Sequence, residues 1–188
     1  SHKGINIKRM VKAMLKNVKS GKGREGASTI SQQLIKNTHL SSEKTYTRKI
    51  KEIALAMQME RQLSKEEILE NYLNIIYFGN NIYGIENASR FYFSKPAENL
   101  TLNESAILAG LIKSPANYCP INNPEKCLNR RNLVLKEMKE DKKISESLYN
   151  ESISRPLEVK VDKNFDNGQN SYSQGAINEA SSILKMPA

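Results

Sequence analysis

The stretch Gly26-Ala27-Ser28-Thr29-Ile30-Ser31-Gln32-Gln33-Leu34-Ile35-Lys36-Asn37 has the pattern of a loop leading into a helix. Thr29 and Gln32 have the spacing of a capping box, in which each side chain bonds the backbone N–H of the other residue. We therefore expect a helix to begin near Ser28 or Thr29.

One face of this expected helix is polar. Thr29, Gln33 and Lys36 recur at helical spacing, and Asn37 lies beside them. Hydroxyl, amide and ammonium groups beside a helix N-terminus suit a bound anion, because unpaired N–H groups and the helix dipole favour negative charge there. The pattern alone leaves open the alternative of an amphipathic surface helix with a solvated polar face.

The composition favours one domain and an anionic partner. The chain has 188 residues, enough for a real core, and a formal net charge of +9. This charge suits nucleic acid, an anionic membrane surface or a phosphorylated substrate. No run of the sequence approaches the roughly 18 to 20 apolar residues of a transmembrane helix, and no signal-peptide pattern is present.

The opening stretch closely resembles the G-x-S-T-I-T-Q-Q-L-x-K-N signature of the peptidoglycan glycosyltransferases, glycosyltransferase family 51. These are the transglycosylase domains of class A penicillin-binding proteins and their monofunctional relatives. Ser31 stands where the family usually has Thr and keeps the hydroxyl group. Four further segments resemble family motifs in the family order: His2-Lys3-Gly4, Arg48-Lys49-Ile50-Lys51-Glu52, Ile68 to Gly79, and Arg130 to Met138.

The resemblance implies a mainly α fold, with a lysozyme-like helical lobe and a small membrane-facing jaw subdomain. The absence of strand alternation agrees with this. We expect the glycosyltransferase domain to occupy residues 1–140, truncated at its N-terminus, and residues 141–188 to hold C-terminal helices and a linker. A short helix is expected over residues 146–154 and a linker over residues 155–170. In bifunctional relatives a transpeptidase domain follows such a linker.

The implied reaction is the polymerisation of lipid II into glycan strands, with inversion and release of undecaprenyl pyrophosphate. The general base of the family is a Glu that would lie seven residues before His2, so we expect this chain to lack it. Glu52 matches the second active-site carboxylate and is expected to be catalytic. It is also the candidate ligand of a divalent cation, Mg²⁺ or Mn²⁺, although the cationic side chains offer an alternative to a metal.

The resemblance also implies a set of substrate-binding side chains that hold the pyrophosphate. They are cations and hydrogen-bonding groups, as a phosphate ligand requires. The expected residues are His2, Ser28, Thr29, Gln33, Lys36, Asn37, Arg48, Lys49 and Lys113. Two of them have plain alternatives, because Arg48 could form an exposed ion pair with Glu52, and Lys113 could complement a helix dipole.

The helices around these motifs are predicted from periodicity and caps. A helix over residues 44–62 carries an apolar face of Ile50, Ile53, Ala54 and Met57, opposite Arg48 and Glu52. A capping box of Ser64 and Glu67 predicts a helix that runs to about Phe78 and stops at Gly79. Further helices are expected over residues 102–113 and from Pro124 onward, the latter with Arg130 and Arg131 holding loops by hydrogen bonds.

The expected partners are lipid II, the growing glycan strand and a membrane surface, without nucleic acid. The expected location is the extracytoplasmic face of the bacterial cell membrane. The acid-free segment Ser1–Arg24 predicts a basic amphipathic helix, which could lie on an anionic membrane or pack into the core. Two other function classes remain: a lysozyme-type hydrolase, and a basic helical nucleic-acid-binding protein.

Cys119 and Cys127 leave two possibilities open. The extracytoplasmic location that the family implies favours a disulfide, which would close a short loop. The position of Cys127 near the apolar side of its helix favours two free thiols packed as small hydrophobic groups. The pair has no CxxC spacing and lacks partners for a zinc site.

Overall fold

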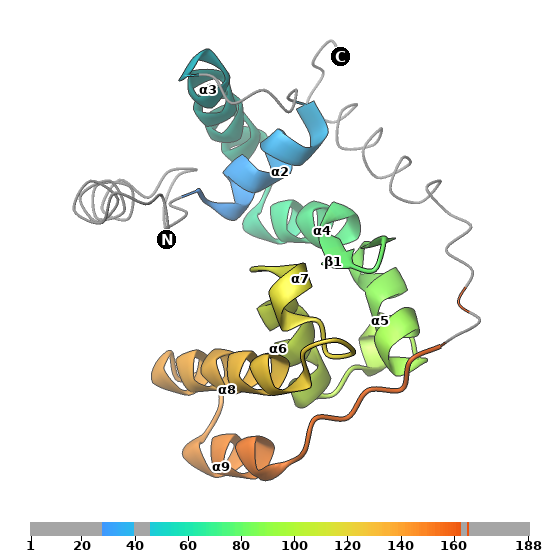
Figure 1. Ribbon diagram of the computed structural model, residues 1–188. Helices are drawn as coiled ribbons and strands as arrows, with labels where there is room; N and C mark the ends of the chain where they lie inside the picture. Colours follow the sequence, from blue (N-terminus) through green and yellow to red (C-terminus); the bar gives the residue numbers. More distant parts are fainter. Residues whose placement is uncertain (1–27, 40–45, 163–164, 166–188) are drawn as a thin grey trace, which may run out of the picture. The chain divides into compact units, whose positions relative to one another are not determined.

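A computed structural model describes residues 28–39, 46–162 and 165, and most of these residues are helical (Figure 1). The expected mainly α fold is therefore confirmed. The chain divides into two compact units, of which the first holds the described residues up to Leu73 and the second holds residues from Asn74 onward. Each unit is described by itself. Within the described ranges, no helix combines the length and apolar character that crossing a membrane requires.

The first unit consists of helices α2 (Ile30–His39), α3 (Tyr46–Gln62) and most of α4 (Lys65–Ile75). Helix α2 packs against α3, and the two are seen side by side in Figure 1. The core of this unit is built from one apolar row on each helix. Its buried members are Leu34, Ile35, Ala56, Met59, Ile68 and Tyr72.

Helix α4 begins as predicted and ends earlier than predicted. The N–H of Ser64 donates to Glu67 Oε2 at 2.7 Å and the N–H of Glu67 donates to Ser64 Oγ at 3.2 Å, which confirms the capping box. The expected continuation to Phe78 is wrong, because the helix stops at Ile75.

A short hairpin stands where the last turn of the predicted helix was expected. Strand β1 (Tyr77–Gly79) pairs antiparallel with β2 (Ile82–Tyr83). The two connecting residues, Asn80 and Asn81, have φ of 49° and 60°. Asparagine tolerates positive φ, and a two-residue turn with φ positive at both positions matches the twist of a hairpin. The turn therefore bends the chain where an apolar run suggested helix.

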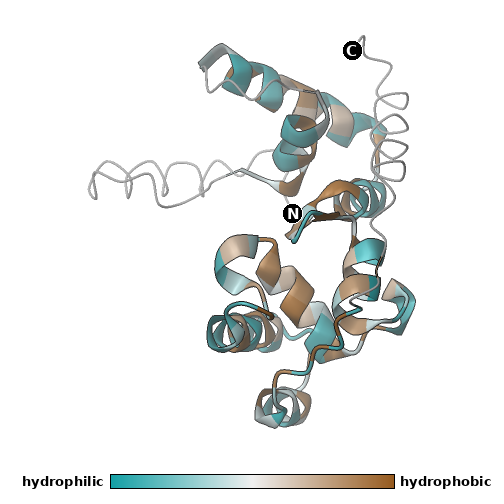
Figure 2. Ribbon diagram, turned by 45° about the vertical axis from the view of Figure 1, so that its right-hand side comes forward, coloured by the Kyte–Doolittle hydropathy of each residue, from teal (hydrophilic) through white to brown (hydrophobic). Residues whose placement is uncertain are grey.

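The second unit is a helical layer around the hairpin. It contains α5 (Ile85–Phe93), the 3₁₀ turn η1 (Ala97–Asn99), α6 (Leu102–Leu111), α7 (Pro115–Tyr118), α8 (Pro124–Glu140) and α9 (Glu146–Ser154). Helix α6 packs along α8, and Figure 2 shows α6 largely in the apolar colour. A Cβ on Gly110 would lie 2.9 Å from Arg130 Cγ, so this glycine permits the close approach of the two helices.

The segment after α9 returns to the same core. Residues 155–162, here called the C-terminal strap, run from α9 to α5 in Figure 1. The N–H groups of Lys160 and Asp162 donate to the carbonyls of Tyr92 and Phe91, both at 2.9 Å. Leu157, Val159 and Phe165 pack against the buried cluster. The helix expected over residues 146–154 is confirmed, and the expected linker contributes to the core as far as Phe165.

Arg131 holds this return segment in place. Its side chain is fully buried, and its guanidinium donates to the carbonyls of Pro156 at 3.0 Å, Arg155 at 2.9 Å and Ile153 at 3.4 Å. It also donates to Asn132 Oδ1. Burial lowers the pKa of Arg131, and Cys127 opposes this shift. The predicted role of this arginine in holding loops by hydrogen bonds is confirmed.

Cys119 and Cys127 are both free and both buried in the core of the second unit. Of the two possibilities left by the sequence, the structure therefore has the packed thiols and not the disulfide. Burial, and then the neighbouring Cys119, raise the pKa of Cys127 to about 11. The thiol is consequently protonated at neutral pH, as suits a small side chain inside an apolar core.

Candidate anion site at the start of helix α2

Helix α2 begins through the predicted capping box. The N–H of Thr29 donates to Gln32 Oε1 at 2.9 Å, and the N–H of Gln32 donates to Thr29 Oγ1 at 3.3 Å. Both side chains are buried, at 7% and 1% exposure. The hydroxyl of Thr29, an expected substrate ligand, thus caps the helix, while Ser28 lies one residue before it at the positive end of the helix dipole.

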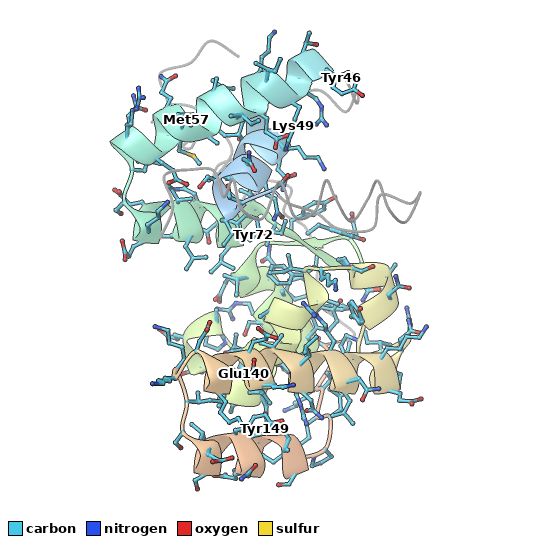
Figure 3. All side chains as sticks on the ribbon, turned by 90° about the vertical axis from the view of Figure 1, so that its left-hand side faces the viewer. Tyr46, Lys49, Met57, Tyr72, Glu140 and Tyr149 are labelled. Carbon is cyan, nitrogen blue, oxygen red and sulfur yellow. The ribbon has the colours of Figure 1, made fainter. Side chains whose placement is uncertain are left out.

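Lys49 joins this helix start to α3. Its Nζ donates to Ser28 Oγ at 3.0 Å and forms an ion pair with Glu52, three residues further along α3. Figure 3 shows Lys49 on the side of α3 that borders α2. The sequence suggested an ion pair between Arg48 and Glu52, and the structure instead pairs Glu52 with Lys49. An ammonium group is therefore fixed beside the N-terminus of α2.

Glu52 lies on the buried side of α3. Its side chain is 2% exposed, whereas Ile50 is 68% exposed and Met57 is 38% exposed. The expected apolar face of this helix therefore faces solvent within its unit, and Ala56 and Met59 lie on the buried side with the carboxylate. A buried charge is tolerated when it is paired, so the ion pair with Lys49 explains how Glu52 occupies this position.

Three more expected ligands follow along α2. Gln33 is half-buried, and its Oε1 accepts a hydrogen bond from the hydroxyl of Tyr72 on α4 at 3.1 Å. Lys36 and Asn37, one helical turn further, are exposed. The polar row predicted from the sequence therefore exists on α2, and Gln33 is the member that a neighbouring helix holds.

The remaining expected ligands are spread over the chain. Arg48 is half-buried on α3, next to Lys49. Lys113 is exposed just after α6 and belongs to the second unit. His2 lies outside the described residues, as does the basic segment Ser1–Arg24. Convergence of all of these residues on one substrate stays a prediction.

A second polar link between α2 and its neighbours was not predicted. Ser31 donates its hydroxyl to Glu60 near the end of α3, and Glu60 also forms an ion pair with Lys65 at the start of α4. The side chain of Glu60 is 4% exposed. The contact of Ser31 with Glu60 joins residues that are 29 positions apart in the sequence, and the contact of Gln33 with Tyr72 joins residues that are 39 positions apart. Helical periodicity carries no signal at such separations.

The donors described around Glu52 do not fit a resident divalent cation. No group of three or more His, Cys, Asp or Glu side chains suited to a metal occurs among the described residues. Mg²⁺ and similar ions prefer several oxygen ligands. Here the Lys49 ammonium already compensates the charge of the Glu52 carboxylate.

A surface hollow of about 590 Å³ lies elsewhere on α3. It is lined by Ala54, Met57, Gln58, Arg61 and Gln62. Helical geometry places these residues on the side of α3 opposite Glu52. The hollow contains none of the expected substrate ligands, so the start of α2 and not this hollow is the candidate site.

Comparisons with known proteins agree with the sequence motifs. The sequence model of a family described as Transglycosylase matches residues 1–139. The chain is 46% identical over 164 residues to penicillin-binding protein 1A of Aquifex aeolicus (strain VF5), covering 87% of this chain and 23% of that protein. It is 43% identical over 157 residues to penicillin-binding protein 1A of Pseudomonas aeruginosa, covering 84% and 19%.

A solved structure is also similar. The crystal structure of penicillin-binding protein 1A from Haemophilus influenzae matches with a TM-score of 0.50 and 30% sequence identity, covering 80% of this chain and 20% of that one. The chain thus spans about a fifth of the length of the relatives that it matches.

Proposed function

Because the chain belongs to the transglycosylase family, we propose that it is the part of a peptidoglycan glycosyltransferase that binds the lipid-linked pyrophosphate of its donor. The donor is lipid II, and the product is a longer glycan strand with release of undecaprenyl pyrophosphate. The observation that supports this most directly is the Lys49 ammonium held between Ser28 and Glu52 at the start of α2.

The leaving group determines what the site must supply. When the acceptor 4-hydroxyl oxygen bonds to C1 of the donor sugar with inversion, the bond from C1 to the pyrophosphate breaks and its electron pair stays on the pyrophosphate oxygen. Negative charge therefore develops at that oxygen. Fixed cations and N–H donors aimed at this charge stabilise the transition state more than the bound donor.

Four of the described residues then have defined tasks. Lys49 supplies a positioned charge, Ser28 supplies a hydroxyl donor, and the N-terminus of α2 adds the positive end of its dipole. Lys36 adds a flexible charge on the same helix, and Arg48 can bind two phosphate oxygens at once. The acceptor proton goes to a general base, a role that a glutamate has in the family and that we assign to none of the described residues of this chain.

Glu52 acts through Lys49 in this proposal. Its buried carboxylate holds the Lys49 ammonium beside Ser28. In this proposal the carboxylate does not itself contact the pyrophosphate. No step is assigned to a divalent cation, because the described donors do not fit one.

Binding of pyrophosphate to the 188-residue chain tests the proposal. We expect Lys49→Ala to weaken the binding of inorganic pyrophosphate and of a short-chain lipid II analogue by about 10- to 100-fold, as the loss of a charge-assisted contact predicts. Lys139→Ala is the matched control, because Lys139 is similarly exposed and ion-paired with Glu146 in the second unit. Equal affinities of wild type and Lys49→Ala in calorimetry would refute the proposed site.

A membrane surface is the proposed neighbour of α3. Its exposed side carries Tyr46, Ile50 and Met57, which are 93%, 68% and 38% exposed and recur at helical spacing. The basic residues Lys51 and Arg61 accompany them, and both are exposed. An apolar stripe with basic flanks suits the boundary of an anionic bilayer, where the lipid-linked substrate also lies.

Vesicle co-sedimentation tests this contact. Ile50→Glu is expected to reduce binding to anionic vesicles several-fold and wild-type binding is expected to weaken with salt. Leu133→Glu is the control, because Leu133 is 42% exposed on α8 in the second unit. Equal losses in both variants would argue against a specific contact through α3.

A further inference from the structure

Tyr72 makes a polar contact that the proposed function does not use. It lies on α4, is 4% exposed, and donates its hydroxyl to Gln33 Oε1 on α2 at 3.1 Å. Figure 3 shows Tyr72 on the side of α4 next to α2. Both residues belong to the first unit, so this contact lies within one compact body.

We propose that Tyr72 is a positioning residue, which turns the side-chain amide of Gln33 so that its NH₂ group and not its oxygen faces the bound pyrophosphate. This inference rests on the proposed function, since it concerns the same anion site. It deepens that proposal by assigning the orientation of one ligand to a residue on another helix.

The side-chain amide of Gln33 has two chemically different ends. A glutamine side chain has an acceptor at one end and two donors at the other, and the two ends have nearly the same size. A hydroxyl that donates to Oε1 fixes which end lies toward α4, so the NH₂ end must point the other way. The structure gives the NH₂ group no hydrogen bond among the described residues, and Gln33 belongs to the same row of α2 as Lys36 and Asn37.

The environment of Tyr72 keeps its hydroxyl protonated, so that the hydroxyl is able to donate. Burial raises the pKa of Tyr72 above the ordinary value of 10.0. The phenol therefore retains its proton at neutral pH and cannot repel the amide oxygen as a phenolate would. The rest of the ring packs among the buried apolar residues of the first unit, which limits its rotation.

Without the hydroxyl, the amide of Gln33 can turn either way. In the wrong orientation its oxygen faces the phosphate oxygens, which also carry negative charge, and a favourable contact becomes a repulsive one. A preorganised donor avoids this loss, in the same way that rigid ligands bind more tightly than mobile ones. The inference thus predicts an effect on anion binding from a residue that does not touch the anion.

A double-mutant cycle tests the inference on the 188-residue chain. Calorimetry with inorganic pyrophosphate compares wild type, Tyr72→Phe, Gln33→Ala and the double variant. We expect Tyr72→Phe to weaken binding about 5- to 10-fold in the wild-type background, the size of one lost hydrogen bond. In the Gln33→Ala background the same change should have no effect, because the amide that it orients is gone.

Tyr149→Phe is the matched control. Tyr149 is a half-buried tyrosine on α9 in the second unit, where its ring contacts Lys139. Removal of the Tyr149 hydroxyl in Tyr149→Phe should leave the affinity for pyrophosphate unchanged. Thermal unfolding of each variant accompanies the titrations, and Tyr72→Phe is expected to stay folded because the ring itself is retained.

The outcomes separate this inference from the proposed function. Absence of pyrophosphate binding by the wild type overturns the anion site, and the role of Tyr72 with it. Wild-type binding that Tyr72→Phe leaves unchanged overturns the role of Tyr72 alone. An equal loss in both backgrounds, as a general loss of structure would give, overturns it as well. A loss confined to the background that contains Gln33 supports it.

Discussion

Replacing Arg131 by methionine is expected to release the C-terminal strap from the second unit. The variant keeps an unbranched buried side chain of similar length and removes the guanidinium that serves three backbone carbonyls. These belong to Ile153, Arg155 and Pro156. Among the described residues, no carboxylate forms an ion pair with Arg131, so its contribution consists of these hydrogen bonds and its packing.

The magnitude follows from the hydrogen bonds. A bond to a charged donor contributes about 1.5 to 3 kcal/mol, but acceptors near the surface recover part of this from water. We take about 1 to 2 kcal/mol for each of the three carbonyls. The variant no longer has the desolvation cost of the buried guanidinium, and this gain offsets part of the stability lost with the three hydrogen bonds. The expected destabilisation is about 3 kcal/mol, and Arg131→Lys, with fewer directed donors, should lose about half of that.

Urea-dependent hydrogen exchange, read by mass spectrometry on peptides from residues 124–162, reports on the second unit by itself. With a slope of about 2 kcal/mol per M, the midpoint should fall by about 1.5 M in Arg131→Met. Arg90→Met is the control, because Arg90 forms an exposed pair with Glu86, and it should shift the midpoint little. A shift in Arg131→Met no larger than in Arg90→Met would refute the reasoning.

Three further predictions concern single positions. Gly84→Ala should destabilise the second unit by about 2 to 3 kcal/mol in urea unfolding, because φ is 82° there and the new Cβ would lie 2.7 Å from the carbonyl oxygen of Asn74; an unchanged midpoint would contradict this. Cys127 should react with iodoacetamide far more slowly in the native chain than in urea, and stability should fall as pH rises from 9.0 to about 11, because the unfolded thiol ionises first; Cys127→Ala should lessen that fall. The backbone N–H and then the hydroxyl of Ser64 lower the pKa of Glu67, so its support of α4 is present above pH 4.5 and is lost as pH falls through the lowered pKa. Glu67→Ala should remove that pH dependence from amide exchange in α4, and an unchanged dependence would count against the cap.

Local signals in the sequence predicted the beginnings of helices well. The pairs Thr29 with Gln32 and Ser64 with Glu67 each form the expected capping box. Helix α8 begins at Pro124, as predicted, because the fixed φ of proline suits the first position of a helix. These contacts span three or four residues, so the sequence contains all of the geometry that they require.

Signals that depend on the neighbours of a helix were less reliable. Ile50 and Met57 belong to the apolar stripe that the sequence shows on α3, yet both are exposed, and the buried side of α3 carries Glu52. The ion pair with Lys49 makes that burial possible, and periodicity alone cannot show it. The partnership of Tyr72 with Gln33 likewise depends on how α4 packs on α2.

Turn chemistry was overlooked where apolar residues dominated the pattern. Ile75 to Phe78 fits a helix by hydrophobicity, and Asn80 and Asn81 carry the opposing signal for a two-residue turn. Whether Cys119 and Cys127 form a disulfide or pack as free thiols depended on the direction in which the chain enters α8. The sequence spacing of the two cysteines does not determine that direction.

The C-terminal strap has a consequence for how the polypeptide is made. Leu157, Val159 and Phe165 pack against the core of the second unit and lie beyond the last residue matched by the family. On the ribosome, this side of the core stays uncovered until those residues leave the exit tunnel. At about 5 to 20 residues per second, the interval from residue 140 to residue 165 is roughly 1 to 5 seconds. During that interval the nascent chain presents the apolar rim around Phe91 to the surroundings, a surface of the kind that chaperones bind.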